Sequence, residues 1–258
     1  MRVVIAGLLA ALFAVPVSAE ESACVAAGDA VQTDVPLRHV AAAIDSKHLT
    51  VAVVGSASSS LPGPNGAAKA YPSRLGEWLK HRLPAVDVKV LVHTQARESA
   101  ADMAKSLPQL LVDDKPDLVV WQTGTVDAML GVDPEAFQSA LDSGLEALHA
   151  GKADAVLMNM QYSPRTDSMI ALGAYLDAMR HGALQHEVPL FDRLALMKNW
   201  NELGIFNLHA DTRTIDVAEA VHDCISRLLV RLIINGADLA RGSNTGAASP
   251  GLPPKDNH

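Results

Sequence analysis

The sequence predicts a doubly wound α/β fold, a three-layer sandwich with a five-stranded parallel sheet between two layers of helices. Short apolar segments alternate with longer amphipathic ones along most of the chain. Hydrophobic residues make up 49% of the 258 residues and aromatic residues only 4%, which suits helices packed on a buried sheet. Strands covered on both faces are almost continuously apolar, so this pattern favours parallel strands with helices on either side.

Five short apolar segments are predicted to form the sheet. In chain order they are HLTVAVV (48–54), VDVKVLV (86–92), PDLVVWQTG (116–124), ADAVLMNM (153–160) and VPLFD (188–192). In a flavodoxin-like sheet of this kind, ligands bind beyond the carboxyl ends of the strands, where the strand order reverses. Polar residues end the first three strands, at 55–58, 92–95 and 122–125. We therefore expect the functional site at this edge.

The segments between these strands have helical periodicity. Asp133 followed by Pro134 is typical of a helix start, with the aspartate as N-cap and the proline in the first turn. That helix is expected to end near His149. The other predicted helices are 36–44, 68–83, 99–113, 167–185, 193–203 and 215–234.

The two ends of the chain differ in composition from the rest. Residues 1–19 combine an arginine, an apolar run and small residues before Glu20, the pattern of a secretory signal peptide. An uncleaved anchor is the alternative, but the run is short for a span of about 20 residues. Residues 20–235 are expected to form one domain, and the Gly/Pro/Ser-rich residues 236–258 a disordered tail. We therefore expect a periplasmic or secreted protein that has no stable membrane span after the signal peptide is cleaved.

Charge and cysteine content restrict the function further. The net charge is −8 and the basic residues are scattered, which argues against a nucleic-acid partner. Cys24 and Cys224 are the only cysteines, and in an exported protein they can form one disulfide. The alternative is two buried thiols. The sequence has no Cys/His spacing typical of a metal site, and we expect neither a metal nor a cofactor.

Several segments in a fixed order carry a resemblance. They are VAVVGSASSS (51–60), YPSRL (71–75), PDLVVWQTGTVDAM (116–129), VLMNMQYSPR (156–165), VPLFDRLALMKNW (188–200) and DCISRLL (223–229). From about Cys24 to Ile234 the chain resembles the SGNH, or GDSL, hydrolase superfamily, most closely its exported bacterial branch. The resemblance implies acyl transfer to water. A serine after the first strand attacks an ester, a histidine before the last helix accepts its proton, and an aspartate three residues earlier orients that histidine.

The resemblance also implies three donors to the oxyanion, and the first three blocks depart from the pattern. In the first block, Gly-Ser-Ser of this branch, Ala57 occupies the nucleophile position. In the second, Gly-Gly-Glu, Ala96 and Arg97 replace the glycines. In the third, Gly-x-Asn, Gly124 is kept but Val126 replaces the asparagine and cannot donate a hydrogen bond.

The last block, Asp-x-x-His, is also altered. His209 fits the histidine position, yet Phe206 stands where the aspartate belongs. Aligned without a gap to the last helix, Asp216 takes the histidine position instead. His222 and Glu219 share a face of that helix, and we expect them to be structural.

Two functions of different classes follow. In the first, the protein keeps the fold, has lost catalysis, and binds a small acyl or glycan ligand, or an envelope protein partner, through the old pocket. The residues of that pocket are Ser56, Ala57, Ala96, Arg97, Gly124, Val126 and Asp127. Asp127 is alternatively a helix-start cap.

In the second, the protein is an active serine esterase or deacylase with a displaced nucleophile. Its substrates are then acyl or acetyl esters of envelope carbohydrate or lipid, as the resemblance implies. Ser58 is the candidate nucleophile, with Ser56 and Ser59 as rivals. His209 is the candidate base, with Asp211 or Asp216 as its orienting partner, and Asp216 is also a rival for the histidine position. The same serines are also typical of turns.

Overall fold

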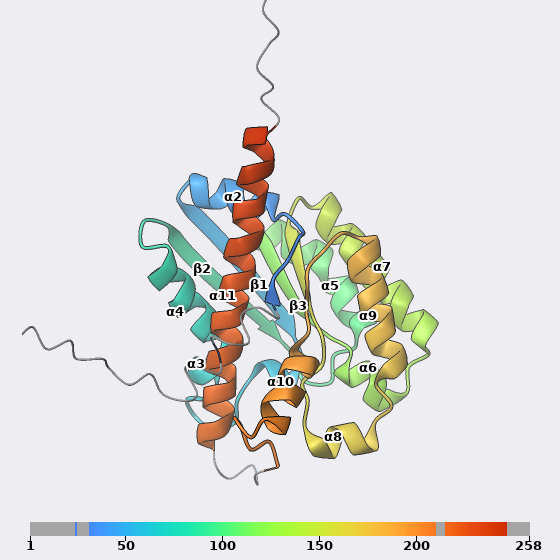
Figure 1. The fold of residues 1–258 in the computed structure, drawn as a ribbon. Helices are drawn as coiled ribbons and strands as arrows, with labels where there is room; N and C mark the ends of the chain where they lie inside the picture. The colour runs from blue at the N-terminus through green and yellow to red at the C-terminus, as the bar shows by residue number, and fades with distance from the viewer. Residues whose placement is uncertain (1–23, 25–30, 210–214, 247–258) are drawn as a thin grey trace, which may run out of the picture.

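The structure, a computed structural model, describes Cys24, residues 31–209 and residues 215–246. The predicted signal peptide lies outside the described residues. The predicted fold is confirmed: one five-stranded, all-parallel sheet has the order β2-β1-β3-β4-β5 and carries helices on both faces (Figure 1). The strands are β1 (His48–Gly55), β2 (Asp87–Thr94), β3 (Leu118–Gln122), β4 (Asp154–Met158) and β5 (Leu190–Phe191).

The register brings the carboxyl ends of the strands to one edge of the sheet. Gly55 at the end of β1 pairs with Thr94 at the end of β2. Gln122 at the end of β3 pairs with Met158 at the end of β4. The strand order reverses between β1 and β3, so residues that follow these two strands lie where a doubly wound sheet binds its ligands.

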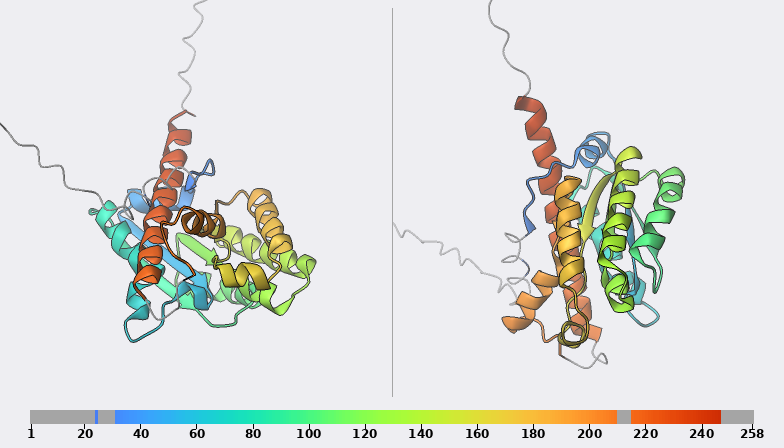
Figure 2. Two further views of the ribbon diagram at one scale, coloured as in Figure 1. Left: turned by 60° about the horizontal axis from the view of Figure 1, so that its bottom comes forward. Right: turned by 90° about the vertical axis from the view of Figure 1, so that its right-hand side faces the viewer.

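The helices form two layers, which Figures 1 and 2 show from three directions. Helices α2, α4, α10 and α11 contribute to the core on one face of the sheet, and α5, α7 and α9 to the core on the other. Their bounds are α2 (Arg38–Asp45), α4 (Tyr71–Arg82), α5 (Ala100–Asp113), α7 (Pro134–Ala150), α9 (Gly173–Gln185), α10 (Arg193–Glu202) and α11 (Ile215–Gly246). Three short helices, α3 (Gly66–Lys69), α6 (Thr125–Leu130) and α8 (Pro164–Met169), lie between them.

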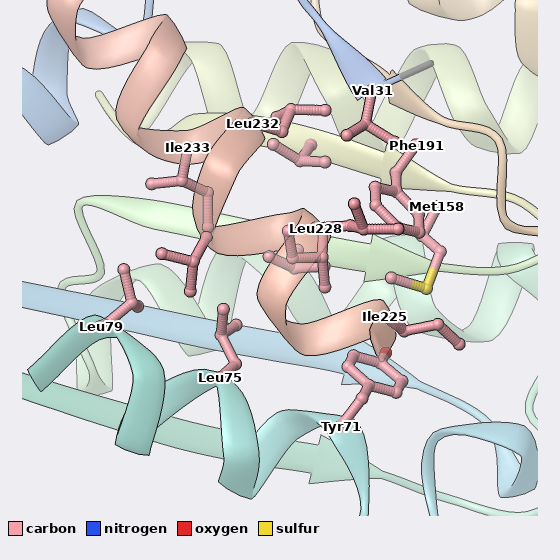
Figure 3. Close-up of a cluster of buried hydrophobic side chains, with 14 of the residues drawn as sticks. Val31, Tyr71, Leu75, Leu79, Met158, Phe191, Ile225, Leu228, Leu232 and Ile233 are labelled. Carbon is pink, nitrogen blue, oxygen red and sulfur yellow. The ribbon is translucent and has the colours of Figure 1, made fainter. Parts of the chain in front are cut away.

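Helix α11 provides much of the first core. Its apolar side chains face the sheet in Figure 3, and Ile225, Leu228 and Leu232 are each at most 2% exposed. They belong to the same cluster as Met158 of β4 and Phe191 of β5. Burying each such side chain stabilises the fold by about 2 kcal/mol, so the helix that follows the predicted catalytic loop is firmly anchored.

The structure differs from the sequence prediction at two helices. The helix predicted over 167–185 is two helices, because Ile170 between α8 and α9 has an extended backbone. The predicted disordered tail was wrong for residues 236–246, which continue α11. Ala237 and Ala240 are buried there, and Arg241 forms an ion pair with Asp45 at 2.8 Å. Packing against α2 therefore extends the helix past Gly236.

The disulfide between Cys24 and Cys224 is present. It joins the start of the described chain to α11 across a sequence separation of 200 residues. Closing a loop of that length stabilises a fold by about 5 kcal/mol in the chain-entropy account. Both cysteines are buried, so the bond belongs to the core rather than to the surface.

Candidate functional site

The polar residues at the carboxyl edge gather around the turn that follows β1. This turn contains a short 3-10 helix, η2 (Ala57–Ser59). Gly55 lets the turn fold back on the sheet, since a Cβ there would lie 2.4 Å from the Oγ of Ser59 and 3.2 Å from the Oε1 of Gln122. A side chain at Gly55 would push these two polar groups apart.

Gln122 holds the turn in place. Its Oε1 accepts hydrogen bonds from the hydroxyls of Ser58 at 3.0 Å and Ser59 at 2.9 Å, and a longer one from the main-chain N–H of Ser56 at 3.4 Å. Each hydroxyl has a single proton, so both serine protons point at the amide oxygen. The sequence singled out Gln122 only as the polar end of its strand.

The four residues of the turn differ in exposure. Ser56 and Ser59 are buried, Ser58 is half-buried and Ala57 is exposed. The structure thus brings the three candidate serines together around Gln122. It leaves a methyl group facing solvent at the end of β1.

A buried tyrosine and histidine extend this hydrogen-bond network. The Oγ of Ser59 lies 2.9 Å from the hydroxyl of Tyr71, which donates because the proton of Ser59 points to Gln122. The main-chain N–H of Tyr71 donates in turn to Nδ1 of His222 at 2.9 Å. Burial raises the pKa of Tyr71 above its ordinary value. Neither the hydroxyl of Tyr71 nor the ring of His222 carries a charge near neutral pH.

His222 is held in one neutral tautomer. Burial, together with the positive charges of Arg193 and Arg74, lowers its pKa to about 3. Its Nδ1 accepts a hydrogen bond, so the ring proton of the neutral form is on Nε2. Glu219 pairs with Lys69 rather than with His222. The two residues are structural but serve different contacts.

A buried arginine lies beneath the turn. Arg193, the first residue of α10, is 0% exposed, and its Nη2 donates to the main-chain oxygen of Ser58 at 3.1 Å and to Oε1 of Gln161 at 3.2 Å. Its guanidinium carbon lies 5.6 Å from the centre of the Tyr71 ring. Burial lowers the pKa of Arg193 to about 10, so the group stays charged. Sequence periodicity missed this residue.

The chemistry that this arrangement supports is limited. Within the described ranges, no hydrogen bond joins Ser56, Ser58 or Ser59 to an imidazole. The same residues hold no group of three or more histidine, cysteine or acidic side chains placed to bind a metal ion. No described helix has an apolar stretch of the length and hydropathy that crossing a bilayer demands. What the edge offers is a set of serine hydroxyls that donate to Gln122, with the buried guanidinium of Arg193 beside them.

Comparison with known families decides the relationship. The sequence model of the Non-GDSL lipase-like family matches residues 23–239. The chain belongs to that family. The predicted SGNH/GDSL superfamily is thereby confirmed, with the structural neighbours in agreement.

Solved structures similar to this Non-GDSL lipase-like protein share its fold at low identity. TesA is 22% identical, with a TM-score of 0.51 over 75% of this chain and 98% of its own. The lipase/acylhydrolase of Enterococcus faecalis is 16% identical, with a TM-score of 0.57 over 71% and 94%. A catalytic mutant of an acetylxylan esterase from Geobacillus stearothermophilus is 14% identical, with a TM-score of 0.58 over 72% and 94%. Comparison with curated proteins finds no match.

In the second block of the Non-GDSL lipase-like chain, an arginine has the left-handed backbone conformation that a glycine usually adopts. Ala96 and Arg97 are both exposed in the turn after β2. Arg97 has φ of 66°, the left-handed region in which a side chain costs about 1 kcal/mol. The turn thus has the shape that a glycine favours, although the side chain has changed.

The third block follows β3. Gly124 has φ of 94° and precedes α6, and Val126 is half-buried in that helix. Asp127 is 1% exposed, and its carboxylate accepts from the main-chain N–H of Ala100 at 3.0 Å. Ala100 is the first residue of α5. Asp127 therefore stabilises the start of α5, and the main-chain N–H groups of Gly124 and Asp127 at the start of its own helix α6 also stabilise its carboxylate, in keeping with the capping alternative.

Among the described residues, no hydrogen bond joins the candidate residues of the last block to the turn after β1. His209 is exposed, and its main-chain N–H donates to Oδ1 of Asn207 at 3.1 Å. Asp216 is exposed in the first turn of α11. Phe206, at the aspartate position, is 2% exposed and packs edge-on against Trp200. A core contact thus replaces the side chain that would orient the base.

Proposed function

We propose that this protein is a catalytically degenerate member of its superfamily, which binds a ligand or partner at the carboxyl edge of the sheet. One observation carries the proposal. Ala57 presents an exposed methyl group where the resemblance places the nucleophile, while the neighbouring hydroxyls of Ser58 and Ser59 both donate to Gln122. Without a nucleophile, the covalent route of acyl transfer is lost.

The positions of the histidines support the same proposal. A serine is a weak nucleophile until an adjacent base accepts its proton. His222 uses Nδ1 to accept from Tyr71, and its lowered pKa of about 3 makes it a poor base near neutral pH. His209 is exposed, and Phe206 supplies no carboxylate to orient it.

We place this activity in the periplasm or outside the cell. The disulfide between Cys24 and Cys224 supports that location, since disulfides persist in oxidising compartments. The signal-like composition of residues 1–19 agrees with it. A small acyl or glycan ligand, or an envelope protein, is the expected partner.

An active esterase remains the second candidate because of one feature. Ser58 is only half-buried and directly follows Ala57, which occupies the nucleophile position. In enzymes without substrate, catalytic hydrogen bonds are often long and tighten only when substrate binds. A rotation of η2 that separated Ser58 from Gln122 would free the Ser58 hydroxyl for attack on an acyl ester.

Hydrolysis of short-chain nitrophenyl esters separates the two candidates. The proposal predicts that the purified protein, Ser58→Ala and Ser60→Ala all hydrolyse acetate and butyrate esters at the background rate. Ser60 is exposed in the same turn and donates only to a main-chain oxygen, so its variant is the matched control. Turnover that disappears in Ser58→Ala and persists in Ser60→Ala establishes the esterase instead.

A further inference from the structure

Arg193 is a buried cation with no acidic partner in the described part of the chain. Its two hydrogen-bond acceptors, the main-chain oxygen of Ser58 and the side-chain oxygen of Gln161, are both neutral. Its Nε and Nη1 are buried and have no hydrogen-bond partner. A buried charge without a counter-charge is costly, and proteins rarely keep one without a use.

Other donors near the same turn are also free. Gln122 spends its Oε1 on the serines of η2, and its buried Nε2 has no partner. Ser58 contacts both side chains, Gln122 through its hydroxyl and Arg193 through its main-chain oxygen. Unused N–H groups therefore belong to both of the side chains that contact Ser58. A group rich in acceptors would satisfy them, and a negatively charged one would also neutralise the guanidinium.

We infer that Arg193 is the receptor for a ligand carboxylate, and that the side-chain oxygen of Gln161 holds its place when no ligand is bound. This inference rests on the proposed function, because it names the ligand class of the same inert site. Arg193 would then bind the free acid that an ester hydrolase releases rather than the ester.

Gln161 is suited to give way. It is half-buried in the segment between β4 and α8, which has no regular secondary structure. Its Oε1 is 3.2 Å from Nη2 of Arg193, at the long end of the hydrogen-bond range. On this inference, rotation of the Gln161 side chain would release Nη2 of Arg193 for the ligand. The main-chain oxygen of Ser58 keeps the other contact.

The charge of the ligand should decide its affinity. The bond from Arg193 to Gln161 already has a charged donor, but a carboxylate can also pair with the guanidinium in a bidentate way and neutralise its buried charge, which the amide oxygen cannot do. A neutral ester or amide offers the acceptor that Gln161 already provides. A neutral ligand therefore gains nothing by displacing Gln161 from Arg193.

Calorimetric titration with hexanoate and with hexanamide tests this inference. We expect hexanoate to bind about tenfold more tightly than its uncharged analogue or better. Gln161→Glu places a carboxylate of the chain itself on Arg193 and should weaken hexanoate binding at least tenfold. Gln161→Ala removes the competing oxygen and should keep or strengthen it. Arg193→Gln should abolish binding, and the two Gln161 variants carry the test if that variant does not fold.

Three results would overturn the inference: no binding of hexanoate, equal binding of hexanamide, or unchanged binding by Gln161→Glu. Ester turnover is measured on the same samples to keep the two proposals apart. Absent hexanoate binding with absent turnover refutes only the carboxylate receptor. Turnover that depends on Ser58 refutes the inert site, whatever hexanoate does.

Discussion

The main-chain N–H of Tyr71 donates to Nδ1 of His222 at 2.9 Å and so joins the first turn of α4 to the N-terminal part of α11. The first N–H groups of a helix have no partner within the helix. Ala70, which precedes α4, has no side-chain acceptor to offer. His222 therefore caps α4 from another helix, and only its neutral form can accept this bond.

Stability should fall as the solution is acidified because His222 resists protonation in the folded state. Its pKa is about 3 in the fold and 6.5 ordinarily. Between these two pKa values the unfolded chain binds a proton at His222 that the folded chain does not, so the free energy of unfolding decreases as pH falls. The stability contributed by neutral His222 is fully present above pH 6.5. The slope is about 1 kcal/mol per pH unit.

Urea unfolding at pH 7.0 and pH 5.0 measures this effect. His222→Asn keeps an acceptor near Nδ1 but has no titrating group, so its stability should change less between the two pH values than that of the parent chain. His209 is exposed, and His209→Asn should leave the parent's pH dependence intact. Equal pH dependence of His222→Asn and the parent would contradict the assignment.

Replacing Arg97 with glycine should stabilise the fold by about 1 kcal/mol, because φ of 66° is strained for a residue with a side chain. Arg97→Ala keeps the Cβ and should give no such gain, which makes it the matched control. Thermal or urea unfolding of both variants provides the measurement. A gain shared by Arg97→Ala would mean that loss of the guanidinium, not relief of the backbone, is responsible.

Removing the carboxylate of Asp127 should lower the stability by about 2 kcal/mol, because the buried N–H of Ala100 then lacks a partner. Asp127→Asn keeps one acceptor oxygen and should retain much of what Asp127→Ala loses. Asp216→Ala, at an exposed position, should change stability very little. Denaturant unfolding of the three variants compares them, and a harmless Asp127→Ala would refute the helix-capping role.

Restoring a hydroxyl alone should not restore hydrolysis. In Ala57→Ser the new serine lies at the exposed end of β1, but no described imidazole is hydrogen-bonded to this turn. Since an unassisted serine is a poor nucleophile, ester turnover is expected to stay at background. Activity in Ala57→Ser would mean that a competent base survives and that only the nucleophile was lost.

The sheet could be predicted because its signal is local. Apolar strands separated by amphipathic helices indicate the fold class, and Asp133 before Pro134 indicates a helix start, where Asp133 does cap α7. The end of α11 could not be predicted in this way. Gly236 suggested a break, whereas burial of Ala237 and Ala240 against neighbouring elements keeps the helix going.

The sequence predicted where the site lies but not which of its side chains contact one another. The polar strand ends identified Gln122 and the serines of η2, yet nothing in the sequence pairs Gln122 with Ser58 across 64 positions. The sequence predicts Arg193 only as the first residue of a helix, because periodicity alone gives no reason to bury a charged side chain. Its position two residues after β5 and beside Asp192, within a segment that carries the family resemblance, is the signal that could have drawn attention to it.

The central claim is that the carboxyl edge of this sheet presents no activated serine. Intact-mass spectrometry after incubation with a fluorophosphonate tests it most directly, since the reagent adds covalently to an activated hydroxyl. The account predicts the unmodified mass for the folded protein and for Ser58→Ala alike. One added phosphonate per folded chain, absent from Ser58→Ala and retained in Ser60→Ala, would contradict it.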